Sequence, residues 1–449
     1  MDNFDVSPLQ YRDLFSVFAK HDNPQEKIGV EVEVGTVRPF TGLSIPYENG
    51  VNLLLQALRK EFDGEPILEG GNIVGVSLSD GGQLGLEHHG ALEYSSRPFT
   101  SITEAVITTL YILQQCADVA KSLDIALLTG GNFPFSTFKD VNWMPLLRGP
   151  IMRNYLMNLG EMGALGQSVM GFALSTQVTL DYLDEEDLVR KLKMLTTISP
   201  VAAALFVNSP LQGGKVSGVL SRRMQYWDKF DPERCGFIPV TLNPRMEITD
   251  FVDWAIEKPM IFRNHNGQVK LAPRKSFSTF LNDGFGDGTF PNYSDWVAHL
   301  SQIWTDVRLR NTIELRIMDG QSFLNIPAVL AFWVGLTYHP PSCKSAWDLM
   351  KGRILTDHKK ARQDVAINGL KAKHGQDSIH ELAIELVKLA KLGLMARVKA
   401  GLEPSSVLNY LTPVEDVVSS GKTFAEQCIE HWQNDMQMVP SSYVKAFQI

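Results

Sequence analysis

The sequence has few cysteines, and none of them stands in a spacing that binds a metal ion. The four, Cys116, Cys235, Cys343 and Cys428, are far apart in a chain of 449 residues, with no C-x-x-C pair and no cluster with histidine. A disulfide framework is therefore not expected. Free thiols favour a reducing compartment.

Segments that would direct the chain to a membrane are also missing. No apolar stretch is long enough to cross a bilayer. The first residues, Met1-Asp2-Asn3-Phe4-Asp5, are acidic and lack both the basic and apolar regions of a signal peptide and the arginine-rich pattern of a transit peptide. Together with the free thiols, these absences predict a cytoplasmic protein without a membrane partner.

Basic clusters and the commonest nucleotide-binding loops are absent as well. The chain has 42 Lys and Arg against 50 Asp and Glu, a formal net charge of -8, and no basic run stands out. Nucleic acid is therefore not an expected partner. No strand leads into G-x-G-x-x-G, and the nearest approach to a P-loop, Leu211-Gln212-Gly213-Gly214-Lys215-Val216, lacks the hydroxyl residue after the lysine. The metalloprotease motif H-E-x-x-H and the hydrolase motif G-x-S-x-G are not found either.

What is present is an ordinary globular composition, 44% hydrophobic and 20% charged, with enough apolar material for a large core. Strand and helix signals follow one another without regular alternation. This favours an α+β fold with a mostly antiparallel sheet over a doubly wound parallel one. A first helix is predicted to begin at Ser7-Pro8 and to end at Asp22-Asn23-Pro24.

The last part of the chain, from about 375 to 449, is predicted to be helical. Three capping boxes lie in it, at Ser378 to Glu381, Thr412 to Glu415 and Thr423 to Glu426. No Gly/Ser-rich or Pro-rich linker separates this region from the rest. We therefore expect a single catalytic domain over residues 1–449, with the helical C-terminal region packed on it.

The most informative stretch is Ile28-Gly29-Val30-Glu31-Val32-Glu33-Val34-Gly35, which alternates apolar and acidic residues. This period of two predicts a half-buried strand with Glu31 and Glu33 on one face and the valines on the other. Two carboxylates one pleat apart repel each other, so this face is favourable mainly where a cation binds. For one such motif alone, a strand with solvated glutamates is the simpler interpretation.

Three later stretches repeat this design of one apolar and one polar face. If residues 83–95 form one unbroken strand, Glu87, His89 and Glu93 share its polar face, although a bulge at Gly90 would change this parity. His88 would then point the other way, so at most one of the two histidines reaches the site.

The predicted strand over 172–182 carries Gln177 on its polar face, and the predicted strand over 307–318 carries Arg308, Arg310, Glu314 and Arg316. A solvated sheet with surface ion pairs worth little is the alternative. Four strands of this kind instead favour a polar concave face with arginines beside five carboxylates: Glu31, Glu33, Glu87, Glu93 and Glu314.

Carboxylate clusters without Cys or His ligands suit hard divalent ions, above all Mg²⁺. Mg²⁺ keeps few protein ligands and takes phosphate oxygens of the substrate, which predicts nucleotide chemistry. The arginines could clamp a carboxylate or a transferring phosphoryl group. A Mg²⁺-dependent phosphohydrolase would suit the same face, and a binding protein without catalysis is a third class, which the intact five glutamates argue against.

Several motifs, in order along nearly the whole chain, resemble the plant and proteobacterial type of glutamate–cysteine ligase, within the wider carboxylate–amine ligase family. The residues that carry the resemblance are Ile28-Gly29-Val30-Glu31-Val32-Glu33, Leu86-Glu87-His88-His89-Gly90-Ala91-Leu92-Glu93, Met144-Pro145 with Arg148 and Ile151-Met152-Arg153, Gln177-Val178-Thr179-Leu180-Asp181-Tyr182, Leu220-Ser221-Arg222-Arg223 with Trp227, and Ile313-Glu314-Leu315-Arg316 with Asp319.

The resemblance implies a fold and a reaction. The fold is a curved, mostly antiparallel sheet, a half-barrel related to that of glutamine synthetase, surrounded by helices. In the implied reaction ATP phosphorylates the γ-carboxylate of L-glutamate, and the amine of L-cysteine attacks the acyl phosphate, as the first step of glutathione-type thiol synthesis. The expected cofactor is Mg²⁺, with ATP as co-substrate and these small molecules as the only expected partners.

The resemblance also assigns roles. The five glutamates, Glu31, Glu33, Glu87, Glu93 and Glu314, are expected to hold Mg²⁺ and through it the ATP phosphates. Arg223 and Arg316 are expected to be catalytic, Arg223 at the transferring phosphoryl group and Arg316 at the glutamate substrate. The expected substrate-binding residues are Arg148 and Arg153 for glutamate, Gln177 for a metal or phosphate, and Trp227 as a wall of the pocket, with plain core packing as the alternative for Trp227.

Some residues depart from the family pattern. His88 and His89 stand in place of Pro-Gly, Ala91 in place of Gln, and Ile317-Met318 in place of Gly-Ala. These changes leave the expected metal and phosphate residues intact and bear on the amine acceptor. A related ligase that joins glutamate to a different amine is therefore the alternative function.

Overall fold

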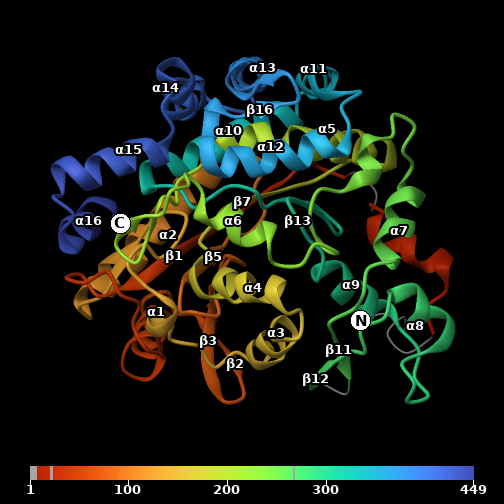
Figure 1. The fold of residues 1–449 in the computed structure, drawn as a ribbon, viewed down its shortest axis with the longest axis horizontal. Helices are drawn as coiled ribbons and strands as arrows, with labels where there is room; N and C mark the ends of the chain where they lie inside the picture. The colour runs from red at the N-terminus through yellow and green to blue at the C-terminus, as the bar shows by residue number, and fades with distance from the viewer. Residues whose placement is uncertain (1–7, 21–23, 266–267) are drawn as a thin grey trace.

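The computed structural model describes residues 8–20, 24–265 and 268–449, and its central element is a large antiparallel sheet (Figure 1). In the described part of the chain this sheet has nine strands, with neighbours in the order β14-β15-β7-β1-β5-β4-β3-β2 and with β6 paired to β1. The strands are β1 (Ile28–Val37), β2 (Glu65–Glu69), β3 (Asn72–Ser77), β4 (Gln83–Leu86), β5 (Leu92–Ser95), β6 (Ala126–Leu128), β7 (Thr176–Leu180), β14 (Val307–Leu309) and β15 (Ile313–Leu315). All its pairings are antiparallel, which confirms the expected α+β class.

Strand β1 lies between β5 and β7 and has the predicted alternation. Val30, Val32 and Val34 are fully buried, whereas Glu31 and Glu33 are half-buried on the other face. Its register places Glu33 opposite Glu93 and Glu31 opposite Gln177. One face of the sheet is thus apolar and the other carries the acidic side chains.

Two stretches predicted as single strands are hairpins instead. Residues 83–95 form β4 and β5, because the chain turns after Leu86: the Gly90 amide donates to the Glu87 carbonyl at 3.0 Å, and Gly90 has a φ of 90° that favours glycine. Residues 307–318 form β14 and β15, with Arg308 opposite Glu314. Glu87 and Glu93 therefore lie on neighbouring segments of one hairpin, not on one strand.

Helices cover both faces of the sheet. They are α1 (Asn52–Glu61), α2 (Ile102–Ser122), α3 (Arg148–Met157), α4 (Glu161–Phe172), α5 (Glu185–Leu205), α6 (Arg222–Asp228), α7 (Ile248–Ile256), α8 (Phe277–Asp283), α9 (Tyr293–Ser301), α10 (Ile326–Thr337), α11 (Pro340–Met350), α12 (Leu355–Asn368), α13 (Ile379–Lys399), α14 (Thr412–Ser420), α15 (Phe424–Glu430) and α16 (Pro440–Phe447). Helix α10 contacts β7 and α2 contacts β1 over the apolar face. Figure 1 shows α10 to α13 together at the top of the view, and α3 and α4 beside the strands β5, β3 and β2.

Helix α10 is the centre of the helical layer, because each of its residues is buried. It meets α13 at a backbone contact: a Cβ on Gly393 would lie 1.8 Å from the Gly335 carbonyl oxygen, and one on Gly335 would lie 2.3 Å from that of Ala390. Only glycine permits this approach. From Ile379 onwards the chain is mainly helical, and α13 packs against α10 through this contact.

Local helix signals were predicted with mixed success. Ser378 and Thr423 accept hydrogen bonds from the amides of Glu381 and Glu426, as expected for N-caps. Thr412 does not cap its helix, which begins at Thr412 itself after Leu411. The predicted helix start at Ser7 and its end at Asp22-Asn23 lie outside the described residues, and between them the chain forms a short 3₁₀-helix, η2 (Tyr11–Phe18).

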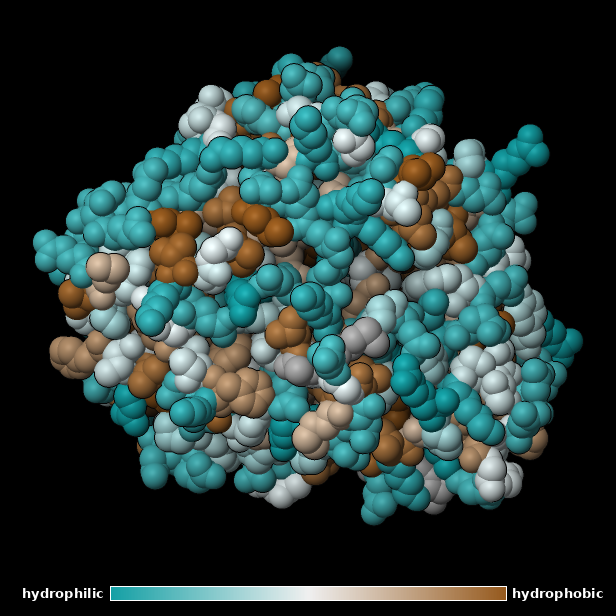
Figure 2. Space-filling view, viewed as in Figure 1, coloured by the Kyte–Doolittle hydropathy of each residue, from teal (hydrophilic) through white to brown (hydrophobic). Residues whose placement is uncertain are grey.

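The surface in Figure 2 is mostly hydrophilic, with small and separate hydrophobic patches. Among the described helices, none combines the length and the apolar composition needed to span a membrane. All four cysteines are free: Cys116, Cys343 and Cys428 are buried, and Cys235 is half-exposed.

Candidate active site

A cavity of about 580 Å³ lies on the polar face of the sheet. Strand side chains form its floor, and residues of α3, α4 and α6 complete the wall. Of the residues predicted for the site, the lining includes Glu31, Glu33, Glu87, Glu93, Arg148, Gln177, Arg223, Trp227 and Arg316. It does not include Arg153 or Glu314.

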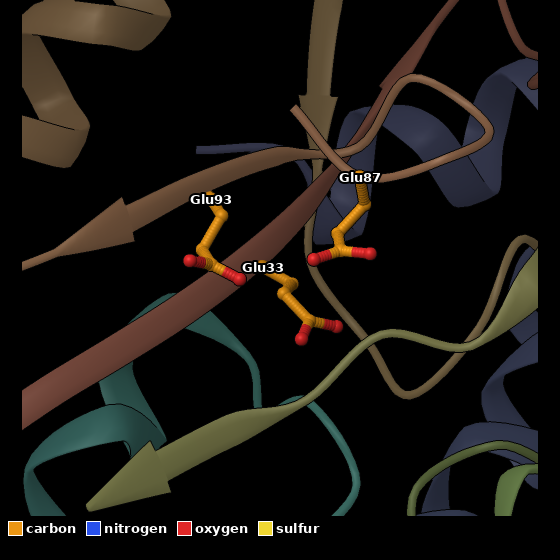
Figure 3. Close-up of side chains that lie close together, drawn as sticks. All are labelled: Glu33, Glu87 and Glu93. Atoms are coloured by element: carbon orange, nitrogen blue, oxygen red, sulfur yellow. The ribbon is translucent and has the colours of Figure 1, made fainter. Parts of the chain in front are cut away.

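Three of the predicted glutamates converge in this cavity. Glu33 comes from β1, Glu93 from β5, and Glu87 from the turn after β4, and Figure 3 shows their carboxylates pointing toward one another. One oxygen of each lies within 4.8 Å of the others. The three side chains are half-buried, so they remain accessible from the cavity.

Hydrogen bonds from the sheet hold two of these carboxylates in place. The Ser175 amide and hydroxyl donate to Glu33 at 2.8 and 2.7 Å, and the Gln177 amide group donates to it at 3.2 Å. The Ser95 hydroxyl donates to Glu93 at 2.8 Å. The carboxylates are therefore oriented by the sheet before any ligand binds.

The electrostatics of the three glutamates favour a bound cation. Burial raises the pKa of Glu33, and burial together with the neighbouring carboxylates raises the pKa of Glu93 and, further, of Glu87. A divalent cation would offset this repulsion, and three carboxylate oxygens are hard ligands of the kind that Mg²⁺ takes. This donor set fits the metal that the sequence predicts.

Glu31 lies beside this group. Burial, followed by the charges of Glu93 and Glu314, raises its pKa to about 7. It lines the cavity from the same face of β1 as Glu33. Its side chain is thus available to a ligand in the cavity.

Glu314 is held differently, by arginines. Its two oxygens pair with Arg308, at 2.5 Å, and with Arg310, and Arg316 lies 3.9 Å away. Burial alone would raise the pKa of Glu314, but these three arginines lower it below its usual value. Because both oxygens are occupied, Glu314 does not join the converging glutamates as the sequence led us to expect.

Arg316 and Arg223 form one structural unit at the edge of the cavity. Arg316 follows β15 and donates to the Gln177 side-chain oxygen at 2.9 Å. Arg223 is buried and donates to the main-chain carbonyls of Arg316 and Ile317 at 2.8 and 3.1 Å. Its Nε has no hydrogen-bond partner in the described parts of the chain. Arg223 therefore fixes the segment that presents Arg316.

Trp227 packs between Arg316 and the aromatic ring of Phe230. Its ring lies 6.0 Å from the Arg316 guanidinium carbon and 5.0 Å from the Phe230 ring. Arg148, the first residue of α3, is exposed and lines the cavity. Arg153 lies instead over the Trp143 ring at 4.7 Å, outside the lining.

Of the two histidines, His88 lines the cavity and His89 does not, whereas an unbroken strand would have placed His89 on the polar face. The reason is the turn after β4: both histidines follow the end of the strand, so their side chains no longer alternate between its two faces. His89 is buried with its ring 4.5 Å from that of Phe133. Burial, with Arg148 and Arg153 nearby, lowers the pKa of His88 to about 3, so its imidazole is neutral.

Three residues shape the site although the prediction gave them no role in it: Ser175, Arg308 and Arg310. Ser175 orients Glu33, and the two arginines neutralise Glu314. A signal was present, because each has the same strand parity as a predicted site residue, Gln177 or Glu314. Parity placed them on the polar face but did not show what they contact.

Comparisons with known proteins give one consistent family. The model of glutamate–cysteine ligase family 2 matches residues 27–441. The chloroplastic glutamate–cysteine ligase of Nicotiana tabacum is 33% identical over 435 residues, covering 95% of this chain and 80% of that protein. The enzyme of Arabidopsis thaliana is 32% identical over 440 residues, covering 96% and 81%.

A solved structure agrees at the level of the fold. The glutamate–cysteine ligase of Francisella tularensis in complex with AMP aligns with a TM-score of 0.52 at 14% identity, covering 96% of this chain and 90% of that one. The relatives also correct one prediction. The expected cytoplasmic location is contradicted, because the curated relatives from Nicotiana, Brassica, Oryza and Arabidopsis are all chloroplastic enzymes.

Proposed function

This chain belongs to glutamate–cysteine ligase family 2, and we propose that the cavity containing Glu33, Glu87 and Glu93 is where it carries out the family's reaction. The protein is an ATP-dependent ligase that forms γ-glutamylcysteine from L-glutamate and L-cysteine for glutathione synthesis. The observation that carries the site assignment is the convergence of three carboxylates, from β1, β5 and the turn after β4, in one cavity.

The reaction needs an activated carboxyl group, because a carboxylate is a poor acyl donor. An oxygen of the glutamate γ-carboxylate attacks the terminal phosphorus of ATP, the bond to ADP breaks, and γ-glutamyl phosphate forms. The cysteine amine then attacks the acyl carbon, loses a proton and expels phosphate. Both steps bring anionic groups together, so the site must supply positive charge.

We assign that positive charge to the arginines of the cavity and to a divalent ion. Glu33, Glu87 and Glu93 would hold Mg²⁺, which when bound neutralises phosphate charge. Glu31 is the candidate for a further ligand. Glu314 could bind a metal ion only if its ion pairs with Arg308 and Arg310 were broken. As the structure stands, these ion pairs hold the two arginines at the cavity.

The substrate-facing roles follow from position. Arg316 points along the sheet face, fixed by Gln177, and would bind a carboxylate of the glutamate substrate. Arg223 would act by positioning Arg316 and by adding positive charge near Glu33. Arg148, which also lines the cavity, is the second candidate to bind a carboxylate. Trp227 would form the wall of the pocket beside the bound glutamate. Arg153 would reach a substrate only through a movement of α3.

We also propose that residues 1–449 work as one catalytic domain with the helical region from about 375 to 449 as a part of it. The glycine contact between α10 and α13 supports this arrangement.

The test is ADP release coupled to product mass. Purified protein with Mg²⁺ and ATP is given glutamate plus one amine at a time, with cysteine among several amino acids. We expect turnover that requires both glutamate and cysteine, and a product with the mass of γ-glutamylcysteine. ATP hydrolysis without glutamate or amine would contradict the ligase assignment. Turnover with an amine other than cysteine would favour the related ligase, since His88 and Ile317-Met318 depart from the family pattern.

A further inference from the structure

A second cavity, of about 250 Å³, shares Trp227 with the active cavity but lies among different elements. Its wall is made by the end of α6, the segment 232–239, the end of α7 and the first half of α12. The ligase reaction described above uses none of the other residues that line it.

A buried imidazole lines this cavity, and one of its two ring nitrogens has no hydrogen-bond partner in the described residues. His358 is 1% exposed, lines the cavity, and packs on the Phe237 ring at 4.5 Å. Its Nδ1 lies 3.0 Å from Nε2 of His374. Its Nε2 has no hydrogen-bond partner within the described residues. A buried polar atom without a partner is costly, so a ligand at this point is favoured.

A hydrogen-bond chain lies behind His358. Its Nδ1 pairs with Nε2 of His374, and Arg353 Nη1 lies 3.4 Å from Nδ1 of His374. In the tautomer in which His374 donates from Nε2, His358 carries its proton on Nε2 and offers a donor to the cavity. Burial lowers the pKa of His358 to about 3, so the ring stays neutral at ordinary pH.

Two lysines add positive charge to the same cavity. Lys258 and Lys359 line it, and neither forms an ion pair within the ranges that the structure describes. The Lys258 ammonium lies 4.5 Å from the centre of the Trp254 ring. Lys359 is exposed at the rim.

The acidic groups of the lining already have partners. Asp228 accepts from Arg362 at 3.1 Å and from Gln363 at 3.0 Å, and it shares Arg362 with Asp306, which accepts from Arg362 Nε at 2.8 and 3.1 Å. Glu233 pairs with Arg274 at 2.5 Å. Among the described residues, the charges of this lining that have no ion-pair partner are those of Lys258 and Lys359, both positive, and His358 adds an unpartnered polar atom.

We propose that this cavity is a second ligand site, which binds a small oxyanion through His358, Lys258 and Lys359. Both a carboxylate and a phosphate group accept hydrogen bonds from this donor set. The cavity is smaller than the range of about 300–1,000 Å³ usual for drug-sized ligands. Its ligand is therefore the size of an amino acid or a simple phosphate, and a nucleotide does not fit.

The test titrates the full chain separately with sodium phosphate and with sodium acetate at constant ionic strength, and follows tryptophan fluorescence, since Trp227 and Trp254 line the cavity. We expect saturable binding of at least one anion, and the anion that binds tells a phosphate ligand from a carboxylate. Lys359→Gln and Lys258→Gln should each weaken binding about fivefold or more. Lys360→Gln, on the exposed neighbour outside the lining, should leave it unchanged.

Three results would overturn the proposal: no saturable binding of either anion, equal affinity in Lys359→Gln and wild type, or loss of binding in Arg316→Gln with full binding in Lys359→Gln. The last result would place the anion in the active cavity. If Lys258→Gln alters the melting temperature, only the anion binding of Lys359→Gln, a variant of an exposed residue, is used to judge the proposal. No turnover is measured, so a failure here is independent of the ligase assignment.

Discussion

Replacing Glu87 with glutamine should stabilise the metal-free protein and at the same time abolish its response to Mg²⁺. The variant keeps the shape of the side chain and an N–H donor toward Glu93, which a protonated Glu87 also offers. What it removes is one negative charge from a group whose oxygens lie within 4.8 Å of one another. The substitution should raise the stability of the metal-free protein and remove the stabilisation by Mg²⁺. Both results together would show that the negative charge of Glu87 binds the cation.

The magnitude follows from the geometry. Two unit charges about 5 Å apart repel by about 3 kcal/mol at an effective dielectric constant of about 20. Proton uptake by carboxyl groups of raised pKa relieves part of this repulsion, so the gain in free energy of unfolding near pH 7 is about 1–3 kcal/mol. An unfolding entropy of about 2 cal/mol/K per residue over 449 residues converts this into a rise of about 1–3 °C in melting temperature.

The same assay measures the metal response. Mg²⁺ at about 100 times its dissociation constant stabilises the folded state by about 2.7 kcal/mol, which corresponds to about 3 °C here. Thermal unfolding of wild type should show this shift on addition of Mg²⁺, and Glu87→Gln should not. Glu65→Gln, on an exposed glutamate of β2, is the control and should behave as wild type. A lower metal-free melting temperature in Glu87→Gln, or an undiminished Mg²⁺ shift, would refute the reasoning.

Three further predictions concern pH, substrate binding and packing. Since the folded pKa of Glu31 is raised to about 7 from about 4.3 unfolded, its contribution to stability is full below the unfolded value and lost as pH rises through 7. Glu31→Gln should therefore flatten the fall in melting temperature between about pH 5 and 8; an unchanged slope would contradict this assignment. Arg316→Lys should lower kcat/KM for glutamate about 100-fold or more in the ADP-release assay, because a lysine cannot bind a carboxylate bidentately, while the Mg²⁺ shift in melting temperature persists; near wild-type kinetics would remove Arg316 from the site. Gly393→Ala should lower the free energy of unfolding by about 3 kcal/mol or more, since its Cβ would lie 1.8 Å from the Gly335 carbonyl, whereas the exposed Leu392→Ala should change it little; equal melting temperatures for the two would show that α10 and α13 can separate at no cost.

The part of the fold that the sequence predicted well is the part set by local pattern. Strand β1 has its valines buried and its glutamates on the opposite face because side-chain direction alternates along any strand. Ser378 and Thr423 cap their helices because a cap depends only on the next three residues. The two hairpins were missed, since strand parity alone does not show where a chain reverses. The turn after β4 depends on a single glycine, Gly90.

The site itself depends on contacts between distant segments, which parity cannot supply. That Glu33 meets Glu93 follows from the register of β1 against β5, and that Glu314 meets Arg308 follows from the hairpin of β14 and β15. Arg153 was assigned with Arg148 to the glutamate substrate on the family resemblance. On a helix, however, residues five apart differ by about 140° in direction, and Arg153 faces Trp143 instead.

The hairpin of β4 and β5 contributes two of the three converging carboxylates, while β1 contributes the third. A cation bound there would link this hairpin to the neighbouring β1, in addition to the ladder of hydrogen bonds between β5 and β1. Opening of the hairpin away from β1 would then require release of the ion. Amide hydrogen exchange across residues 83–95 should therefore become slower with Mg²⁺, whereas exchange in α10, which is sealed in the core, should not change.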